Sequence, residues 1–219
     1  MIKKLSILVT VFYINLSIAS DDTSSEFVNK VNTVSDSIVE IIDPPGASAL
    51  GIMVDTLSSL KELKKQNKGS IENITALINI KFLPNIDIKT AVKLTLQNHW
   101  DGISTHDRII FQKYISQSLV RDYAGILATY ENLESINIAV DPNVKRRDNK
   151  AIVKLNITFN DNPKVFVVSM KMIRSGRWRI YDVVFSGVSL MKTYRSQFDS
   201  YISRRGFDAL LEKISTKVD

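Results

Sequence analysis

The sequence predicts an α+β domain in which a four-stranded antiparallel, curved sheet is covered by helices that come before and after it. Up to Tyr130, apolar residues recur at helical spacing. Beyond it, apolar and polar residues alternate as they do in strands. The four expected strands are Ile136–Val140, Ala151–Phe159, Val165–Ile173 and Arg177–Phe185. From Val188 the helical spacing returns, so helices and strands do not alternate along the chain.

Five helices are expected before the sheet and two after it. Their ranges are 26–42, 50–63, 71–82, 86–100 and 104–130, then 188–205 and 207–214. The run Asp43-Pro44-Pro45-Gly46 is expected to end the first helix. Ser104 and Asp107 have the spacing of a capping box, and Ser189 is a candidate N-cap for the helix that follows it.

Turn residues between the strands predict two hairpins, and the hairpins decide which side chains share a face. A turn at Asp161-Asn162 places Ile157 opposite Phe166, and a turn at Ser175-Gly176 places Met170 opposite Tyr181. One face then carries Ala151, Val153, Leu155, Ile157, Phe159, Phe166, Val168, Met170, Met172, Tyr181, Val183 and Phe185. The other carries Ile152, Lys154, Asn156, Thr158, Val165, Val167, Ser169, Lys171, Trp178, Ile180 and Asp182. The first face is apolar and the second mixed, as in a sheet covered on one side.

An apolar face of this kind can be an ordinary core or the wall of a cavity, and alternation alone leaves both open. Met170 and Met172 favour a cavity, because methionine adapts to ligands of varying shape. Arg174, Arg177 and Arg179 are expected at one end of the same face. They could hold a phosphate at a cavity mouth, or form a hairpin tip in solvent.

The first residues predict export. Lys3 and Lys4 precede an apolar run that is shorter than the roughly 20 residues of a membrane span, and Ser17-Ile18-Ala19 resembles a cleavage site. We therefore expect a signal peptide at residues 1–19 and a single domain at residues 20–219, soluble after export and monomeric. The absence of cysteine excludes disulfides and a lipid-modified cysteine anchor.

Catalytic and cofactor motifs are missing from the sequence. It has two histidines, His99 and His106, and no H-E-x-x-H, P-loop, G-x-G-x-x-G or G-x-S-x-G pattern. We therefore expect that the protein binds no cofactor or metal and is not an enzyme. Lys145-Arg146-Arg147 is the best candidate for nucleic-acid contact, but it lacks interleaved aromatic residues and is better explained as a charged loop. The formal net charge of +6 suits anionic partners in general.

Several motifs in one order resemble the MlaC family of periplasmic phospholipid-binding proteins, also called toluene-tolerance proteins. They are LPNID at 83–87, Trp100, Phe111 with Leu119 and Tyr123-Ala124, GRWRIYDV at 176–183, GVSL at 187–190, YRSQF at 194–198 and GFDAL at 206–210. The resemblance covers residues 74–214. Two departures are a segment at 44–70 that is longer than usual, interpreted as a helical elaboration, and Gln97 in place of an expected glycine.

The resemblance implies a phospholipid carrier with a cone-shaped, NTF2-like fold and an apolar cavity between sheet and helices. Such carriers shuttle glycerophospholipid between an outer-membrane MlaA–porin complex and an inner-membrane ABC transporter that contains MlaD, and so maintain outer-membrane lipid asymmetry. The expected cavity lining is Tyr123, Leu127, Val153, Leu155, Ile157, Phe166, Val168, Met170, Met172, Tyr181, Val183 and Met191. The lipid headgroup would face solvent near Arg174, Arg177 and Arg179.

Two other functions fit the same apolar face. One is a hydrolase or isomerase on the same cone-shaped fold that uses Asp182 or His99. The other is a chaperone for exported lipoproteins. Both would use the same apolar face, so the sequence separates them from a carrier only through the missing catalytic motifs.

Overall fold

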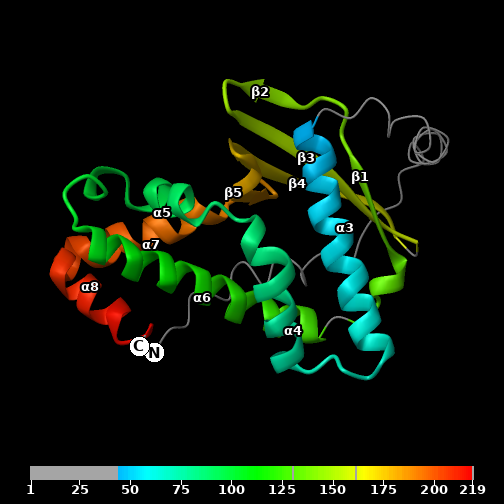
Figure 1. Cartoon of the computed structure of the whole chain (residues 1–219), viewed down its shortest axis with the longest axis horizontal. Coiled ribbons are helices and arrows are strands. Elements are labelled where there is room, and N and C mark those ends of the chain that lie inside the picture. The colour runs from blue at the N-terminus through cyan, green and yellow to red at the C-terminus, as the bar shows by residue number, and fades with distance from the viewer. Residues whose placement is uncertain (1–43, 130, 161, 219) are drawn as a thin grey trace. The chain divides into compact units, whose positions relative to one another are not determined.

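The computed structural model describes residues 44–129, 131–160 and 162–218 (Figure 1). The expected signal peptide and the expected helix at 26–42 lie outside these residues. The helices are α3 (Pro44–Lys65), α4 (Ile71–Leu77), the π-helix η1 (Ile78–Phe82), η2 (Leu83–Asn85), α5 (Ile88–Leu96), η3 (Gln97–His99), α6 (Thr105–Thr129), η4 (Leu133–Ser135), α7 (Leu190–Arg205) and α8 (Phe207–Ser215). The strands are β1 (Ile136–Val140), β2 (Lys145–Arg147), β3 (Lys150–Phe159), β4 (Asn162–Ser175), β5 (Arg177–Phe185) and β6 (Val188–Ser189).

The α+β class is confirmed, and the sheet is antiparallel with two more strands than the four expected. Its order is β1-β3-β4-β5-β6, and β2 pairs with β3 beside β1. The expected strands correspond to β1, β3, β4 and β5. The sequence did not predict β2 because its three residues are all charged, nor β6 because two residues are too few to show alternation.

The first hairpin has the predicted register. Val153 lies opposite Met170, Leu155 opposite Val168 and Ile157 opposite Phe166. The second hairpin differs from the prediction. Its turn is centred on Gly176, at φ 74°, and a bulge follows, so that Met172 lies opposite Ile180 and Met170 opposite Val183.

The bulge moves side chains between the two faces of β5. Trp178 and Ile180 join the apolar face, and Tyr181 is the extra residue that leaves it. The prediction that Tyr181 shares a face with Met170 was therefore wrong. The prediction assumed a two-residue turn. A turn around one glycine reverses the predicted alternation up to Ile180, and the bulge at Tyr181 restores it from Asp182 onward.

Capping residues explain where α4, α6 and α7 begin. Ser70 accepts a hydrogen bond from the Asn73 backbone at the start of α4, and the Ser189 hydroxyl accepts one from Lys192 at the start of α7. Ser104 and Asp107 form the predicted capping box at α6. Helix α3 is described from Pro44 onward, so the predicted end of the preceding helix at Asp43-Pro44-Pro45-Gly46 lies at the edge of the described residues and stays a prediction.

The backbone of Gln97 adopts a conformation that favours glycine, the residue expected at this position from the family resemblance. Its φ is 41° and its ψ is −105°, outside the regions that residues with a side chain prefer. The chain turns here from α5 into η3 and reaches the buried Trp100 three residues later. Packing of that indole therefore holds Gln97 in a conformation that glycine would adopt without strain.

Three clusters of buried side chains form the core. One joins α5, α6, α7 and α8 around Phe111, Ile115 and Phe198. The second joins α3 to the sheet around Leu155 and Met170, and the third joins α3, α4, η1 and the end of α6. Helix α3 contributes to two of these clusters, so the segment 44–70 is part of the core. No helix in the described part of the chain is long and apolar enough to cross a membrane.

Candidate functional site

The face of the sheet that carries Val153, Leu155, Met170 and Met172 is called the covered face. These four side chains are at most 1% exposed and pack with Ala49, Ile52 and Met53 of α3. Figure 1 shows α3 crossing the sheet in front of β3 and β4. This part of the predicted lining is close-packed core, and a ligand could reach it only if α3 moved.

The same face continues beyond α3 into a group of half-buried apolar side chains, here called the aromatic end. Its members are Ile157, Phe159, Phe166, Val168 and Phe185. None of them belongs to the three buried clusters of the described residues. Five neighbouring apolar side chains that stay partly exposed form a surface on which an apolar ligand could gain contact area.

Phe166 is the centre of the aromatic end. Its ring meets Phe159 edge-on, with centroids 5.6 Å apart, and stacks with Phe185 at 6.5 Å and an interplanar angle of 15°. The Lys164 ammonium lies 5.3 Å from the Phe166 centroid. The rings therefore hold one another in place and present an ordered apolar wall beside a cation.

Helix α6 joins the aromatic end through β1. Ile136 lies opposite Phe159 in the sheet and packs with the cluster that includes Tyr123 and Leu127. Burial, reinforced by the Asp122 carboxylate, raises the pKa of Tyr123 to about 12. The shift reflects the apolar surrounding of the Tyr123 phenol, which disfavours its charged form.

The remaining residues of the predicted cavity lining, Val183, Met191 and Tyr181, lie in three different parts of the structure. Val183 packs against the covered-face core, whereas Met191 is buried among α5, α6 and α7, where it accepts a hydrogen bond from the Thr95 hydroxyl at 3.6 Å. Tyr181 lies on the opposite side of the sheet, with the Lys150 ammonium 6.0 Å from its ring centroid. The predicted lining is therefore not one continuous surface.

The three arginines do not share a face, which corrects the predicted cluster. Arg174 lies opposite Trp178 on the covered face, whereas Arg179 lies opposite Ile173 on the other face. Arg177 flanks the turn and donates a hydrogen bond to the Pro84 carbonyl at 2.8 Å. The single-glycine turn is the reason, because it shifts every residue of β5 up to Ile180 by one position relative to the assumed pairing.

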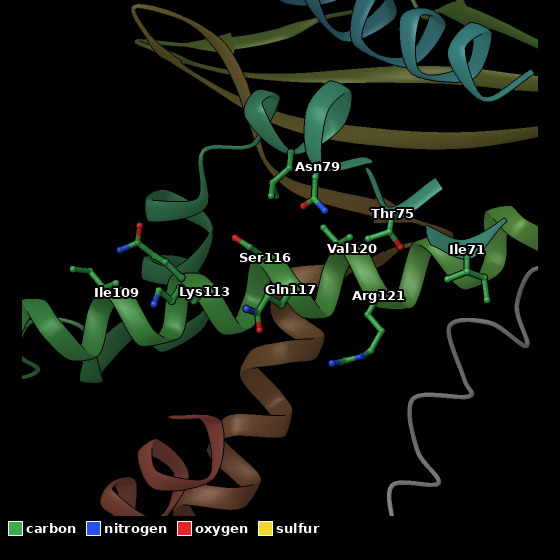
Figure 2. A pocket seen from close by; sticks show the side chains of 11 residues that line it. Ile71, Thr75, Asn79, Ile109, Lys113, Ser116, Gln117, Val120 and Arg121 are labelled. Carbon is green, nitrogen blue, oxygen red and sulfur yellow. The ribbon is translucent and has the colours of Figure 1, made fainter. Parts of the chain in front are cut away.

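A groove of about 600 Å³ lies between α6 and the α4–η1 segment (Figure 2). Its lining is Ile71, Thr75, Asn79, Leu83, Ile109, Gln112, Lys113, Ser116, Gln117, Val120 and Arg121. Figure 2 shows Ser116 and Val120 on α6 facing Asn79 and Thr75. The sequence did not predict this groove, because its α6 side is a stripe of mostly polar residues that looks like a solvated helix face.

The two side chains proposed for catalysis have structural contacts. The Asp182 carboxylate is fully buried and accepts hydrogen bonds from the Lys171 ammonium at 2.8 Å, the Ser189 hydroxyl at 2.7 Å and the Met191 backbone at 3.1 Å. His99 stacks on Phe207, with centroids 5.5 Å apart, beside a hollow of about 350 Å³. The described residues contain no group of three or more His, Asp or Glu that could hold a metal ion.

Together these features define an α+β domain in which helices cover one apolar face of an antiparallel sheet and leave the end of that face partly open. The chain belongs to the MlaC protein family, whose sequence model matches residues 52–216. The match begins inside α3 and so includes most of the segment 44–70.

Known relatives agree with this assignment. The chain is 26% identical to the toluene tolerance protein ttg2D of Pseudomonas putida over 160 residues, which are 72% of this chain and 73% of the relative. It is 23% identical to the intermembrane phospholipid transport system binding protein MlaC of Haemophilus influenzae, over 64% of this chain and 66% of the relative. A phospholipid-binding protein from Ralstonia solanacearum, solved in complex with a phospholipid, has a TM-score of 0.67 and 23% identity, and the alignment covers 80% of this chain and 99% of that one.

Proposed function

We propose that this chain is a phospholipid carrier that holds the acyl chains of a glycerophospholipid against the aromatic end and leaves the headgroup in solvent. Ile157, Phe166 and Val168 of the sheet and Tyr123 and Leu127 of α6 would contact the acyl chains. Val153, Leu155, Met170 and Met172 would form the packed core beside this surface and hold its strands in place, without contact to the acyl chains while α3 covers them. Lys164, beside Phe166, is a candidate for the phosphate, in place of the arginine cluster that the register separates.

The observation that carries this proposal is the partly open apolar wall in a member of the MlaC family. A plain core would bury Ile157, Phe166, Val168 and Phe185, as it buries Leu155 and Met170 on the same face. Relatives named for phospholipid transport and phospholipid binding support a lipid as the ligand for this wall.

The energetics of the cargo suit such a surface. Two acyl chains carry about 30 methylenes, and at about 0.8 kcal/mol each their exposure to water costs about 24 kcal/mol. A carrier must offset most of this cost without binding more strongly than a bilayer does, or it could not release the lipid. Phenylalanine, isoleucine and valine without buried polar anchors meet both demands and would discriminate weakly among headgroups.

The proposed site of action is the periplasm, reached after removal of residues 1–19. There the carrier would exchange phospholipid with an outer-membrane MlaA–porin complex and with an inner-membrane ABC transporter that contains MlaD. These partners are proposed from family membership.

Native mass spectrometry of the chain without residues 1–19, purified without detergent, tests the proposal. We expect a monomer with bound phospholipid, or one that takes up phospholipid from vesicles. Val168→Trp should fill the open wall and lower the lipid load severalfold, whereas Val167→Trp, on the opposite face of the same strand, should not. Lipid-free protein that also takes up none from vesicles would reject the proposal.

A third variant separates the two surfaces that could hold acyl chains. Ser116→Trp would fill the groove between α4 and α6, which the proposal leaves without lipid. We therefore expect Ser116→Trp to keep the lipid load of the unmodified protein. Loss of lipid from Ser116→Trp but not from Val168→Trp would move the acyl chains to the groove and reject the assignment to the aromatic end.

A further inference from the structure

The face of the sheet opposite the covered face, here called the open face, carries a concentrated array of cations. The members of this array, here called the basic array, are Lys145, Arg147, Lys150, Lys154, Lys171 and Arg179. The described side chains of β2, β3 and β4 on this face are half-buried or exposed, whereas Asp182 of β5 and Ser189 of β6 are buried where α7 begins. From the sequence, Lys145-Arg146-Arg147 was predicted to be a charged loop. In the structure these residues form strand β2.

Strand pairing brings these cations together. Lys150 and Lys154 lie on β3 on either side of Ile152, and Lys145 lies opposite Ile152 on β2. Across β3 in the other direction, Lys171 also lies opposite Ile152. Side chains directly opposite or diagonal in a sheet are about 5–8 Å apart, so these four lysines form one patch.

Few carboxylates balance this patch. Lys171 is paired with the buried Asp182, and Arg147 lies 3.9 Å from the exposed Asp148. Lys145, Lys150, Lys154 and Arg179 have no carboxylate partner among the described residues. The Arg179 Nε is buried and makes no hydrogen bond in the described part of the chain. Like charges at these distances repel one another, so contact with an anionic surface would reduce the electrostatic repulsion among the cations.

The net positive charge of the chain is concentrated in the residues of the sheet and its turns. Residues 136–189 contain ten lysines and arginines and four aspartates, a net charge of +6, which equals the formal net charge of all 219 residues. The other residues are balanced. A field of one sign confined to one region favours a large anionic partner, because it orients the molecule before contact.

We propose that the basic array docks this protein on the anionic surface of a phospholipid bilayer. Besides the lysines and arginines, the open face presents Val165 and Val167, which are 39% and 43% exposed. Cations interspersed with apolar side chains suit the boundary between headgroups and acyl chains. A bilayer is favoured over an acidic protein because the cations belong to strands β2, β3, β4 and β5, and a wide array needs a partner whose negative charge is equally wide.

This inference does not rest on the proposed cargo, because a chain that carried no lipid could still dock through this face. Co-sedimentation with vesicles of phosphatidylcholine alone, or mixed with about equal phosphatidylglycerol, measures the docking. Binding is expected only to the anionic vesicles and should be lost at about 1 M salt, where the Debye length is about 3 Å.

Two triple variants with the same net charge locate the contact. Lys145→Gln/Lys150→Gln/Lys154→Gln removes half of the basic array, and Lys65→Gln/Lys89→Gln/Lys93→Gln removes three exposed lysines from helices α3 and α5. Each basic residue near an anionic surface strengthens binding about fivefold, so the first variant should bind about a hundredfold more weakly and the second about as well as the unmodified protein.

Three outcomes would overturn the proposal. Equal weakening by both variants would show that net charge alone matters. Equal binding to neutral and anionic vesicles would show that apolar contacts, and not the cations, bind the protein to the bilayer. No vesicle binding at low salt would leave an acidic protein as the partner class for this face. The bound lipid, measured on the same samples by native mass spectrometry, keeps this test separate from that of the cargo.

Discussion

The two faces of the sheet are made by the same strands and have opposite surroundings. On the covered face, Val153, Leu155 and Met170 are almost fully buried beneath α3. One residue away along the same strands, Lys154, Val167 and Ser169 remain half-buried or exposed on the open face. The covered face in turn changes along its length, from packed core under α3 to the half-buried aromatic end.

The comparison shows that burial, more than residue type, distinguishes a structural surface from a candidate binding surface in this domain. Leu155 and Ile157 are both aliphatic and share a face of β3, but only Leu155 belongs to a buried cluster. Val167 and Val168 are neighbours with opposite orientations. Each contrast can be tested by changing one residue and its counterpart.

The largest effect is expected at Asp182, the buried carboxylate on the open face. Asp182→Ala should lower the free energy of unfolding by about 4 kcal/mol, because it removes three hydrogen bonds and leaves the Lys171 ammonium without its carboxylate. Urea denaturation measures the change. Asp148→Asn on the exposed β2–β3 turn is the control, since asparagine also tolerates the φ of 53° at this position, and it should leave the midpoint unchanged. A loss below about 1 kcal/mol for Asp182→Ala would show that this buried pair does not stabilise the fold.

A matched pair of truncations compares the two faces directly. Leu155→Ala should cost about 3 kcal/mol, because it opens a cavity under α3. Val167→Ala on the open face should cost less than about 0.5 kcal/mol, since its side chain already contacts solvent. Thermal or urea unfolding of both variants decides the point, and similar costs would mean that the open face is covered in solution.

A smaller change in the free energy of unfolding is expected at alkaline pH, where Tyr123 and Tyr181 should contribute differently. Burial raises the pKa of Tyr123 to about 12, from about 10 in the unfolded chain. A raised acid pKa means that the unfolded state loses its proton first, so the free energy of unfolding should fall between about pH 10 and 12, by about 2 kcal/mol.

The variant Tyr123→Phe should remove this part of the alkaline loss. Tyr181→Phe should change it less, because on the open face the Lys171 ammonium opposes the rise that burial causes in the pKa of Tyr181. Denaturant unfolding of both variants at a series of alkaline pH values provides the measurement. An unchanged alkaline slope in Tyr123→Phe would place the titrating group elsewhere.

Prediction from sequence succeeded where the pattern is local. The first hairpin register followed from turn residues and alternation, and the helix starts at Ser104 and Ser189 followed from capping residues. It failed in the second hairpin. A turn of one glycine and a turn of two residues look alike in sequence, and the bulge at Tyr181 depends on how β5 packs against its neighbours.

The candidate site was predicted in part for the same reason. Ile157, Phe166 and Val168 were assigned to the correct face, but alternation could not show that they are half-buried while Leu155 and Met170 are core. The groove between α4 and α6 gave no signal, because polar residues on a helix face indicate solvent equally well. Lys145 and its neighbours were assigned to a loop because three charged residues carry no strand pattern.

The sequence by itself determined the α+β class, the four long strands and the apolar character of one sheet face, because each depends on neighbours along the chain. Tertiary structure alone decided which part of that face α3 covers, which part remains half-open, and that the cations of β2, β3, β4 and β5 gather on the other face. These outcomes depend on pairing between distant segments, where a one-residue shift moves a side chain from one face to the other.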